Sequence, residues 1–169
     1  MQHKNIILIG MPGAGKSTVG VLLAKRLSRW FIDTDVLIQS IEMRALKDII
    51  AEHTLEGFLA IERAHLESIE AANAVIATGG SAVYSPCAME KLKSGSLCVY
   101  LDVPLEEIER RIGNITERGV VISDGKTIKR LYAERAPLYE HYADITVPCA
   151  SRSLEENVDA VIEAITASV

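Results

Sequence analysis

Two short segments of the sequence carry the residue types that phosphoryl transfer needs. The first, Gly10-Met11-Pro12-Gly13-Ala14-Gly15-Lys16-Ser17, fits the pattern G-x-x-x-x-G-K-[ST] in full. Its glycines let backbone N–H groups point at a phosphate, and a helix that begins near Lys16 adds its positive end. Lys16 can reach the terminal phosphates, and the Ser17 hydroxyl can bind Mg²⁺. A glycine-rich turn with a solvated lysine is the plain alternative, but the complete motif between an expected strand and an expected helix favours a nucleotide-binding loop.

The second segment, Asp33-Thr34-Asp35, directly follows another expected strand. Ligand sites in open parallel sheets gather at the carboxyl ends of the strands, so both carboxylates should lie on the side of the phosphate loop. One aspartate could simply cap the helix that follows. Two acids at this edge allow more, because one could lie near hydrated Mg²⁺ while the other takes a proton from an attacking alcohol.

A phosphate loop alone is compatible with a kinase, a GTPase switch or a motor. The sequence contains no N-K-x-D motif for guanine, and no long insertion that could couple hydrolysis to movement. A chain of 169 residues with two irregular insertions therefore resembles a small-molecule kinase most.

The elements that must position these residues alternate between short β-branched runs and longer amphipathic segments. This predicts an α/β fold, namely a five-stranded parallel sheet of the P-loop NTPase type with helices on both faces. The expected strands are Asn5–Ile9, Trp30–Ile32, Ala74–Ala77, Leu97–Leu101 and Ile145–Val147, with Trp30 packed. The expected helices are Lys16–Ser28, several pieces from Asp35 to Ala72, Pro86–Lys93, Pro104–Ile112, Gly125–His141 and Ser153 to about Ile165. We expect one domain over residues 1–169, with an acceptor-binding insertion at about 33–72 and a lid at about 113–124.

Composition narrows the class of protein further. A net charge of -5 argues against a general nucleic-acid binder. No apolar stretch reaches the length of a membrane span, and the first apolar run is too short for a signal peptide, so we expect a cytoplasmic protein without a membrane partner. Three widely spaced cysteines suggest reduced thiols. The sequence contains no large exposed apolar stripe, which favours a monomer.

Several landmarks, in this order, give the chain a resemblance to the shikimate kinase family over nearly its whole length. They are the phosphate loop Gly10–Ser17, Asp33-Thr34-Asp35, Phe58 with Glu62, Thr78-Gly79-Gly80, Arg118, and Arg135-Ala136-Pro137-Leu138-Tyr139. The resemblance implies ATP- and Mg²⁺-dependent phosphorylation of a hydroxyl of shikimate, a step of aromatic amino-acid biosynthesis.

The resemblance also implies roles for individual residues. Asp35 would deprotonate the acceptor hydroxyl, Asp33 and Ser17 would serve Mg²⁺, and the catalytic groups would be Lys16, Asp35 and the lid residue Arg118. The nucleotide would be bound by Gly10, Gly13, Ala14, Gly15, Lys16, Ser17, Thr18 and Arg111, the last packing on adenine. The acceptor would be bound by Asp35, Phe58, Gly79, Gly80, Ser81 and Arg135, with Arg135 on its carboxylate. The plain alternatives are a helix-end charge for Arg111, a solvated loop charge for Arg118 and a surface ion pair for Arg135.

The chain departs from the family pattern mainly where the acceptor should sit. Leu59 replaces an arginine that would grip the acceptor carboxylate, which should cost about 1.5–3 kcal/mol per charge-assisted hydrogen bond lost. Ser81 replaces a glycine, as an αL-compatible swap or as a side chain that narrows the pocket. The other departures are Met43 for glycine, Thr54-Leu55 for a Gly-Glu pair and Gly119 for proline in the lid.

Three hypotheses follow from this pattern. The chain phosphorylates shikimate, with Arg63 or Arg44 replacing the lost arginine if binding is not simply weak. Alternatively, it acts on another small hydroxylated acid such as homoserine or gluconate, or it is a nucleotide-binding module without catalysis. The two aspartates and Arg118 argue against the last, because a pure binder needs neither an acceptor base nor a lid arginine.

Overall fold

Five parallel strands form the centre of the computed structural model, which describes residues 5–112 and 127–168. They are β1 (Asn5–Ile9), β2 (Trp30–Asp33), β3 (Ala74–Ala77), β4 (Leu97–Asp102) and β5 (Ile145–Pro148), in the order β2-β3-β1-β4-β5. All five expected strands are confirmed. The three central strands, β3, β1 and β4, are buried almost throughout, which explains their uninterrupted apolar sequences.

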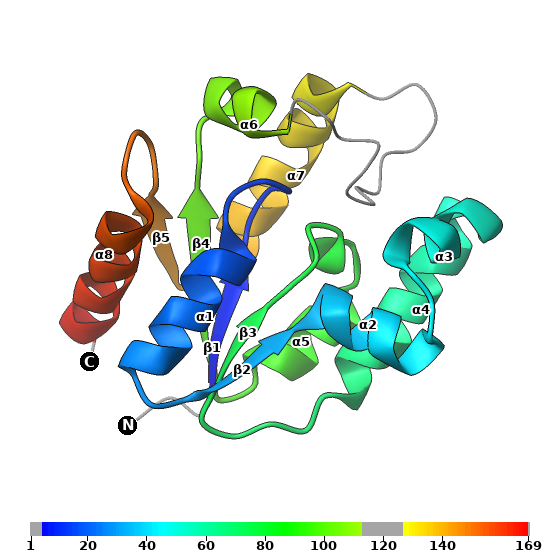
Figure 1. Ribbon diagram of the computed structural model, residues 1–169, viewed down its shortest axis with the longest axis horizontal. Helices are drawn as coiled ribbons and strands as arrows, with labels where there is room; N and C mark the ends of the chain where they lie inside the picture. Colours follow the sequence, from blue (N-terminus) through cyan, green and yellow to red (C-terminus); the bar gives the residue numbers. More distant parts are fainter. Residues whose placement is uncertain (1–4, 113–126, 169) are drawn as a thin grey trace.

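Helices cover both faces of this sheet (Figure 1). Their bounds are α1 (Lys16–Arg26), α2 (Thr34–Glu42), α3 (Leu46–Glu52), α4 (Leu55–Ser68), α5 (Pro86–Lys93), α6 (Leu105–Arg111), α7 (Ile128–Tyr142) and α8 (Leu154–Ala167), with a 3₁₀ turn, η1, at Ala82–Tyr84. Helices α1 and α8 pack together on one face, whereas α4, α5 and α7 lie on the other. The expected α/β class is thus confirmed, and the expected lid lies outside the described residues.

Two hydrophobic cores support the site. The main core joins the sheet to helices on both of its faces. A smaller cluster, the insertion core, consists of Ile38, Leu46, Ile49 and Phe58 from α2, α3 and α4. The residues of the expected insertion form two short helices and the longer α4, which share an apolar centre beside the carboxyl end of β2 (Figure 1).

One expectation about packing was wrong. Trp30 opens β2 and is 76% exposed rather than packed. Strand β2 lies at the edge of the sheet and pairs only with β3, placing Trp30 opposite Ala74 at the start of the strand. An edge strand has a neighbouring strand on one side only, so side chains at its end have fewer neighbours to pack against.

The described helices fall short of the length and apolar character that a membrane crossing would require. Among the cysteines, which are all free, Cys98 and Cys149 are buried and Cys87 is exposed.

Candidate functional site

The phosphate loop connects β1 to α1 and has the conformation that its glycines predict. Gly13 and Gly15 have φ angles of +80° and +91°, in the left-handed region that favours glycine. Gly13 is also required by space, because a Cβ there would lie 2.7 Å from Cγ1 of Ile112. The loop therefore curls around the start of α1, a helix of eleven residues whose first-turn N–H groups can hold an anion.

Lys16 is buried beneath this loop. Its Nζ donates hydrogen bonds to the carbonyl oxygens of Gly10, at 2.8 Å, and Met11, at 2.9 Å. Burial lowers the pKa of Lys16 from its usual 10.5 to about 8, although the Asp35 carboxylate opposes this shift. The lysine thus lies among carboxylates and loop carbonyls, while the neighbouring Ser17 and Thr18 are exposed.

A cavity of about 580 Å³ joins the loop to the region expected to bind the acceptor. Its nucleotide half is lined by Pro12, Gly13, Gly15, Lys16, Ser17, Thr18, Arg111 and Ile112, and its other half by Asp35, Leu46, Phe58, Thr78, Gly79, Gly80, Ser81 and Arg135. The structure therefore brings together most residues that the sequence singled out. Gly10, Ala14 and Asp33 are not among the lining residues, and Arg118 lies outside the part of the chain described.

The two aspartates after β2 have different environments. Asp33 Oδ1 accepts hydrogen bonds from the backbone N–H groups of Asp35, at 3.0 Å, and Val36, at 3.2 Å, and so caps α2. The Asp35 carboxylate instead faces the cavity, and its burial raises its pKa while Lys16 opposes the rise. The capping alternative thus holds for Asp33, and Asp35 is the carboxyl that faces the cavity and has a raised basicity.

Gly79 and Gly80 form a close backbone wall at the end of β3. A Cβ on Gly79 would lie 2.6 Å from Glu62 Oε1 and 2.7 Å from Asp35 Oδ1, so two carboxyl groups converge on this glycine. The Gly79 N–H donates to Thr34 Oγ1 at 2.9 Å. The wall is fixed in this position because the Tyr139 hydroxyl donates to the Gly80 carbonyl at 2.7 Å.

Arg135 reaches the cavity from α7. Its side chain is only 1% exposed, so the surface ion-pair alternative is wrong. Nε donates to the Tyr84 hydroxyl at 3.1 Å, and the guanidinium lies 5.0 Å from the centroid of the Tyr84 ring. These contacts hold a planar cation in the acceptor half, where it can bind a carboxylate in a bidentate manner.

Glu62, a landmark of the family resemblance without an expected role of its own, lies beside the site in the structure. It lies on α4 behind the cavity wall, is 2% exposed, and accepts a hydrogen bond from Ser81 Oγ at 2.9 Å. Burial raises its pKa to about 7, with the Ser81 hydrogen bond acting in the opposite direction. Its four-residue distance from Phe58 on one helix could have placed it on the same face, but only the fold reveals its neighbours Gly79 and Ser81.

The structure also shows where Leu59 and the arginines expected to compensate for it lie relative to the cavity. Leu59 is half-buried against the insertion core rather than lining the cavity, so it adds no apolar wall there. Arg44 pairs with Glu52 and Arg63 lies 3.8 Å from Glu67, both with largely exposed side chains. Neither arginine lines the cavity, and the idea that one of them replaces the missing guanidinium gains no support from their positions.

Ser81 has φ −90° and ψ −9°, which any residue adopts. The αL-compatible interpretation of this substitution was therefore wrong. A side chain at this position costs no backbone strain, and it lines the cavity.

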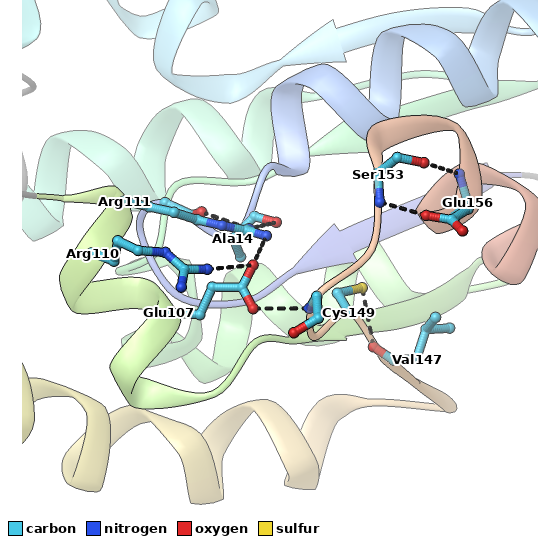
Figure 2. A network of polar contacts seen from close by, with 10 residues as sticks. Ala14, Glu107, Arg110, Arg111, Val147, Cys149, Ser153 and Glu156 are labelled. Atoms are coloured by element: carbon cyan, nitrogen blue, oxygen red, sulfur yellow. Dashed lines mark hydrogen bonds and ion pairs between the residues drawn. The ribbon is translucent and has the colours of Figure 1, made fainter.

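A polar network ties Arg111 to the phosphate loop (Figure 2). Arg111 donates to the Gly13 carbonyl at 3.2 Å and pairs with Glu107 one turn earlier on α6. The other oxygen of Glu107 accepts from the Ser151 N–H at 3.0 Å, in the segment between β5 and α8. Arg111 is thus more than a helix-end charge, since it reaches the loop and lines the nucleotide half of the cavity.

The chain is similar to a known protein family, both in sequence and in structure. The family model described as shikimate kinase matches residues 12–166. Shikimate kinases of Francisella tularensis subsp. holarctica and Francisella philomiragia are each 37% identical over 168 residues, which cover 95% of this chain and 94% of theirs.

Solved structures agree with the sequence matches. Shikimate kinase from Acinetobacter baumannii, in complex with shikimate, superposes with a TM-score of 0.89 at 28% identity, covering 99% of this chain and 95% of that one. The Aquifex aeolicus shikimate kinase gives 0.81 at 31% identity, covering 97% of each chain. A gluconokinase from Sinorhizobium meliloti, at 16% identity and a TM-score of 0.54 over 98% of this chain and 93% of its own, shares the fold alone. These matches cover nearly the whole chain and agree with the phosphate loop and the acceptor half of the cavity, and they establish that the chain belongs to the shikimate kinase family.

Proposed function

We propose that this small-molecule kinase transfers the terminal phosphoryl group of ATP to a hydroxyl of shikimate. The observation that carries the proposal is the single cavity with a phosphate loop on one side and Asp35, Gly79 and Arg135 on the other. Such a cavity places a nucleotide phosphate and a hydroxylated acid next to one another, and phosphoryl transfer depends chiefly on that placement and on charge neutralisation.

In the proposed reaction the acceptor oxygen attacks the terminal phosphorus. The new O–P bond forms as the bond from phosphorus to the ADP oxygen breaks, and Asp35 takes the hydroxyl proton. Burial raises the pKa of Asp35, which makes it a better base than an exposed aspartate. Lys16 donates its remaining N–H to the terminal phosphate, and Arg135 holds the carboxylate of the acceptor.

The residues present fit a hydrated Mg²⁺ ion. Within residues 5–112 and 127–168 no cluster of three His, Cys, Asp or Glu residues could enclose a metal. Mg²⁺ that bridges nucleotide phosphates keeps several waters and needs only one or two protein ligands. The exposed Ser17 hydroxyl would hold the ion directly, and the Asp33 carboxylate, whose Oδ1 caps α2, would hold a bound water through its other oxygen. Bound Mg²⁺ would supply neutralisation of phosphate charge.

A coupled assay of ADP release tests this proposal. Shikimate should stimulate ADP release from ATP and Mg²⁺, whereas gluconate and homoserine should not. Asp35→Asn should lower kcat about 10²–10⁴-fold, because it removes the base, while ATP affinity stays near that of the wild type. Equal loss of ATP binding and turnover would contradict the role of Asp35, and ADP release that ignores shikimate would contradict the substrate.

One observation keeps a second acceptor in view. The arginine expected next to Phe58 is Leu59, and among the described residues Arg135 is the sole cation lining the acceptor half beyond the phosphate loop and α6. A small hydroxylated acid with a more weakly held carboxylate is therefore the alternative substrate. Comparison of kcat/KM for shikimate, gluconate and homoserine separates the two.

A further inference from the structure

We propose that Ser81 determines acceptor specificity and that Glu62 is the positioning residue behind it. In this arrangement the Glu62 carboxylate engages the proton of the Ser81 hydroxyl, and the Ser81 oxygen therefore presents only lone pairs to a hydroxyl of the acceptor. The inference rests on the proposed function and extends it to a polar contact that the family pattern, with glycine at this position, does not contain.

The first step is the position of Ser81. It lines the acceptor half of the cavity between Gly80 and η1, yet it is almost fully buried. Its Oγ donates to Glu62 Oε1 at 2.9 Å. A serine hydroxyl has a single donor and two lone pairs, so a hydroxyl whose proton is held by Glu62 can only accept from a ligand.

The second step is that Glu62 is held in place. Its carboxyl group lies directly against the cavity wall at Gly79, since a Cβ on Gly79 would come within 2.6 Å of Glu62 Oε1. Lys16 and Arg135 favour its charged form, and Asp35 opposes it. Among the described residues, the Tyr139 hydroxyl on α7 also faces it and already donates to Gly80. The carboxyl is thus confined behind the wall and acts on the acceptor through Ser81 rather than by contact.

The hydrogen-bonding groups of the acceptor half determine which acceptor it selects. With Asp35 and Ser81 both accepting, and Arg135 donating, the acceptor half favours an acid that offers at least two hydroxyl protons near its carboxylate. A ketone or ether oxygen facing Ser81 would meet lone pairs and lose a hydrogen bond. Leu59 removes a donor from this region of the family pattern and Ser81 adds an acceptor, so selection shifts from the carboxylate toward the hydroxyl groups.

Ser81→Ala, compared across three substrates, tests the inference. The substrates are shikimate and two analogues, each lacking one of the ring hydroxyls that are not phosphorylated. Loss of one neutral hydrogen bond should raise the acceptor KM about fivefold for shikimate and for one analogue, but leave the KM for the other analogue nearly unchanged. The KM for ATP should stay within about twofold, since a hydrogen bond on the acceptor side is lost. An equal rise for all three substrates would overturn the proposal, because a merely structural role does not distinguish the hydroxyls.

The role of Glu62 has its own readout. In the wild type, kcat/KM for shikimate should rise with pH through about 7, as Glu62 ionises and fixes the Ser81 proton. Glu62→Gln keeps a similar shape but cannot titrate, so the rise near pH 7 should disappear from its profile, whereas the rise caused by ionisation of Asp35 should remain. Persistence of the rise near pH 7 in Glu62→Gln would overturn the positioning role. Wild-type turnover of shikimate reports on the proposed function itself, so its failure is distinguishable from failure of either variant.

Discussion

Gly79→Ala is the sharpest test of how the two buried carboxyl groups are arranged. The new methyl group would lie 2.6 Å from Glu62 Oε1 and 2.7 Å from Asp35 Oδ1. Reaching ordinary separations of about 3.5 Å requires each oxygen to withdraw by roughly 0.8 Å. Glu62 is buried and cannot swing into solvent, whereas Asp35 is only partly buried and faces the cavity, so the shift must be taken up by Asp35, Glu62 or the strand end itself.

The size of the effect follows from this displacement. A misplacement of about 1 Å in a positioning group can cost about 10²-fold in rate, so kcat/KM for shikimate should fall about a hundredfold. Overpacking should lower the free energy of unfolding by about 1–3 kcal/mol. ATP affinity should change little, because the crowded oxygens lie in the acceptor half of the cavity.

The assay is coupled ADP release with varied shikimate, together with thermal unfolding and a direct measurement of ATP binding. Gly95→Ala is the matched control. It places a side chain at a positive φ, +72°, a strain that Gly79 does not have, but no heavy atom of the described residues lies within 4 Å of its Cβ. The control should lose about 1–2 kcal/mol of stability without loss of kcat/KM. Unchanged kcat/KM in Gly79→Ala, or equal losses in both variants, would refute the argument that crowding at Asp35 and Glu62 limits the reaction.

Three further predictions concern other parts of the structure. The pKa of Lys16 falls from 10.5 to about 8 on folding, so the unfolded chain binds more protons between these pH values and the free energy of unfolding should rise across that window. Lys16→Met should abolish this rise in urea titrations, and a rise that persists in the variant would show that another group causes it. Tyr139→Phe leaves the Gly80 carbonyl without its donor, so the free energy of unfolding should fall by about 1–3 kcal/mol. The KM for shikimate should rise more than the KM for ATP, and equal rises of the two KM values would count against a local effect. Met43 has a φ of +52° at the end of α2, so Met43→Gly should stabilise the fold by about 1 kcal/mol without altering kcat, and a lower melting temperature would show that the αL strain is absent.

Sequence patterns sufficed for the sheet because the strands are covered on both faces. Uninterrupted apolar runs such as Ile6–Ile9 have only one suitable environment, and β1 lies at the centre of the sheet. The same reasoning predicted the exposure of Trp30 wrongly, because the sequence of a strand does not show whether another strand pairs with it on each side. Strand order is a property of the whole fold, and it decides the exposure of this side chain.

The site was predictable where function depends on a local backbone motif. The glycines of the phosphate loop and the pair Asp33 and Asp35 specify their positions through a few adjacent residues. Glu62 and Leu59 lie on one turn of α4 and face different surroundings, the cavity wall and the insertion core. Which of these helix positions meets the ligand depends on how α4 docks against Gly79 and Ser81, and no local pattern encodes that docking.

The two hydrogen bonds from Lys16 to Gly10 and Met11 close the phosphate loop into a ring that runs through the lysine side chain. Such a ring keeps its shape without a ligand, so much of the ordering that a flexible loop would undergo on binding a nucleotide is already complete in the free protein. An ammonium group has three N–H donors, so one remains for an arriving oxygen while the ring stays intact. The nucleotide therefore binds to a preorganised loop, and a shorter or uncharged side chain at this position would open the loop before any ligand binds.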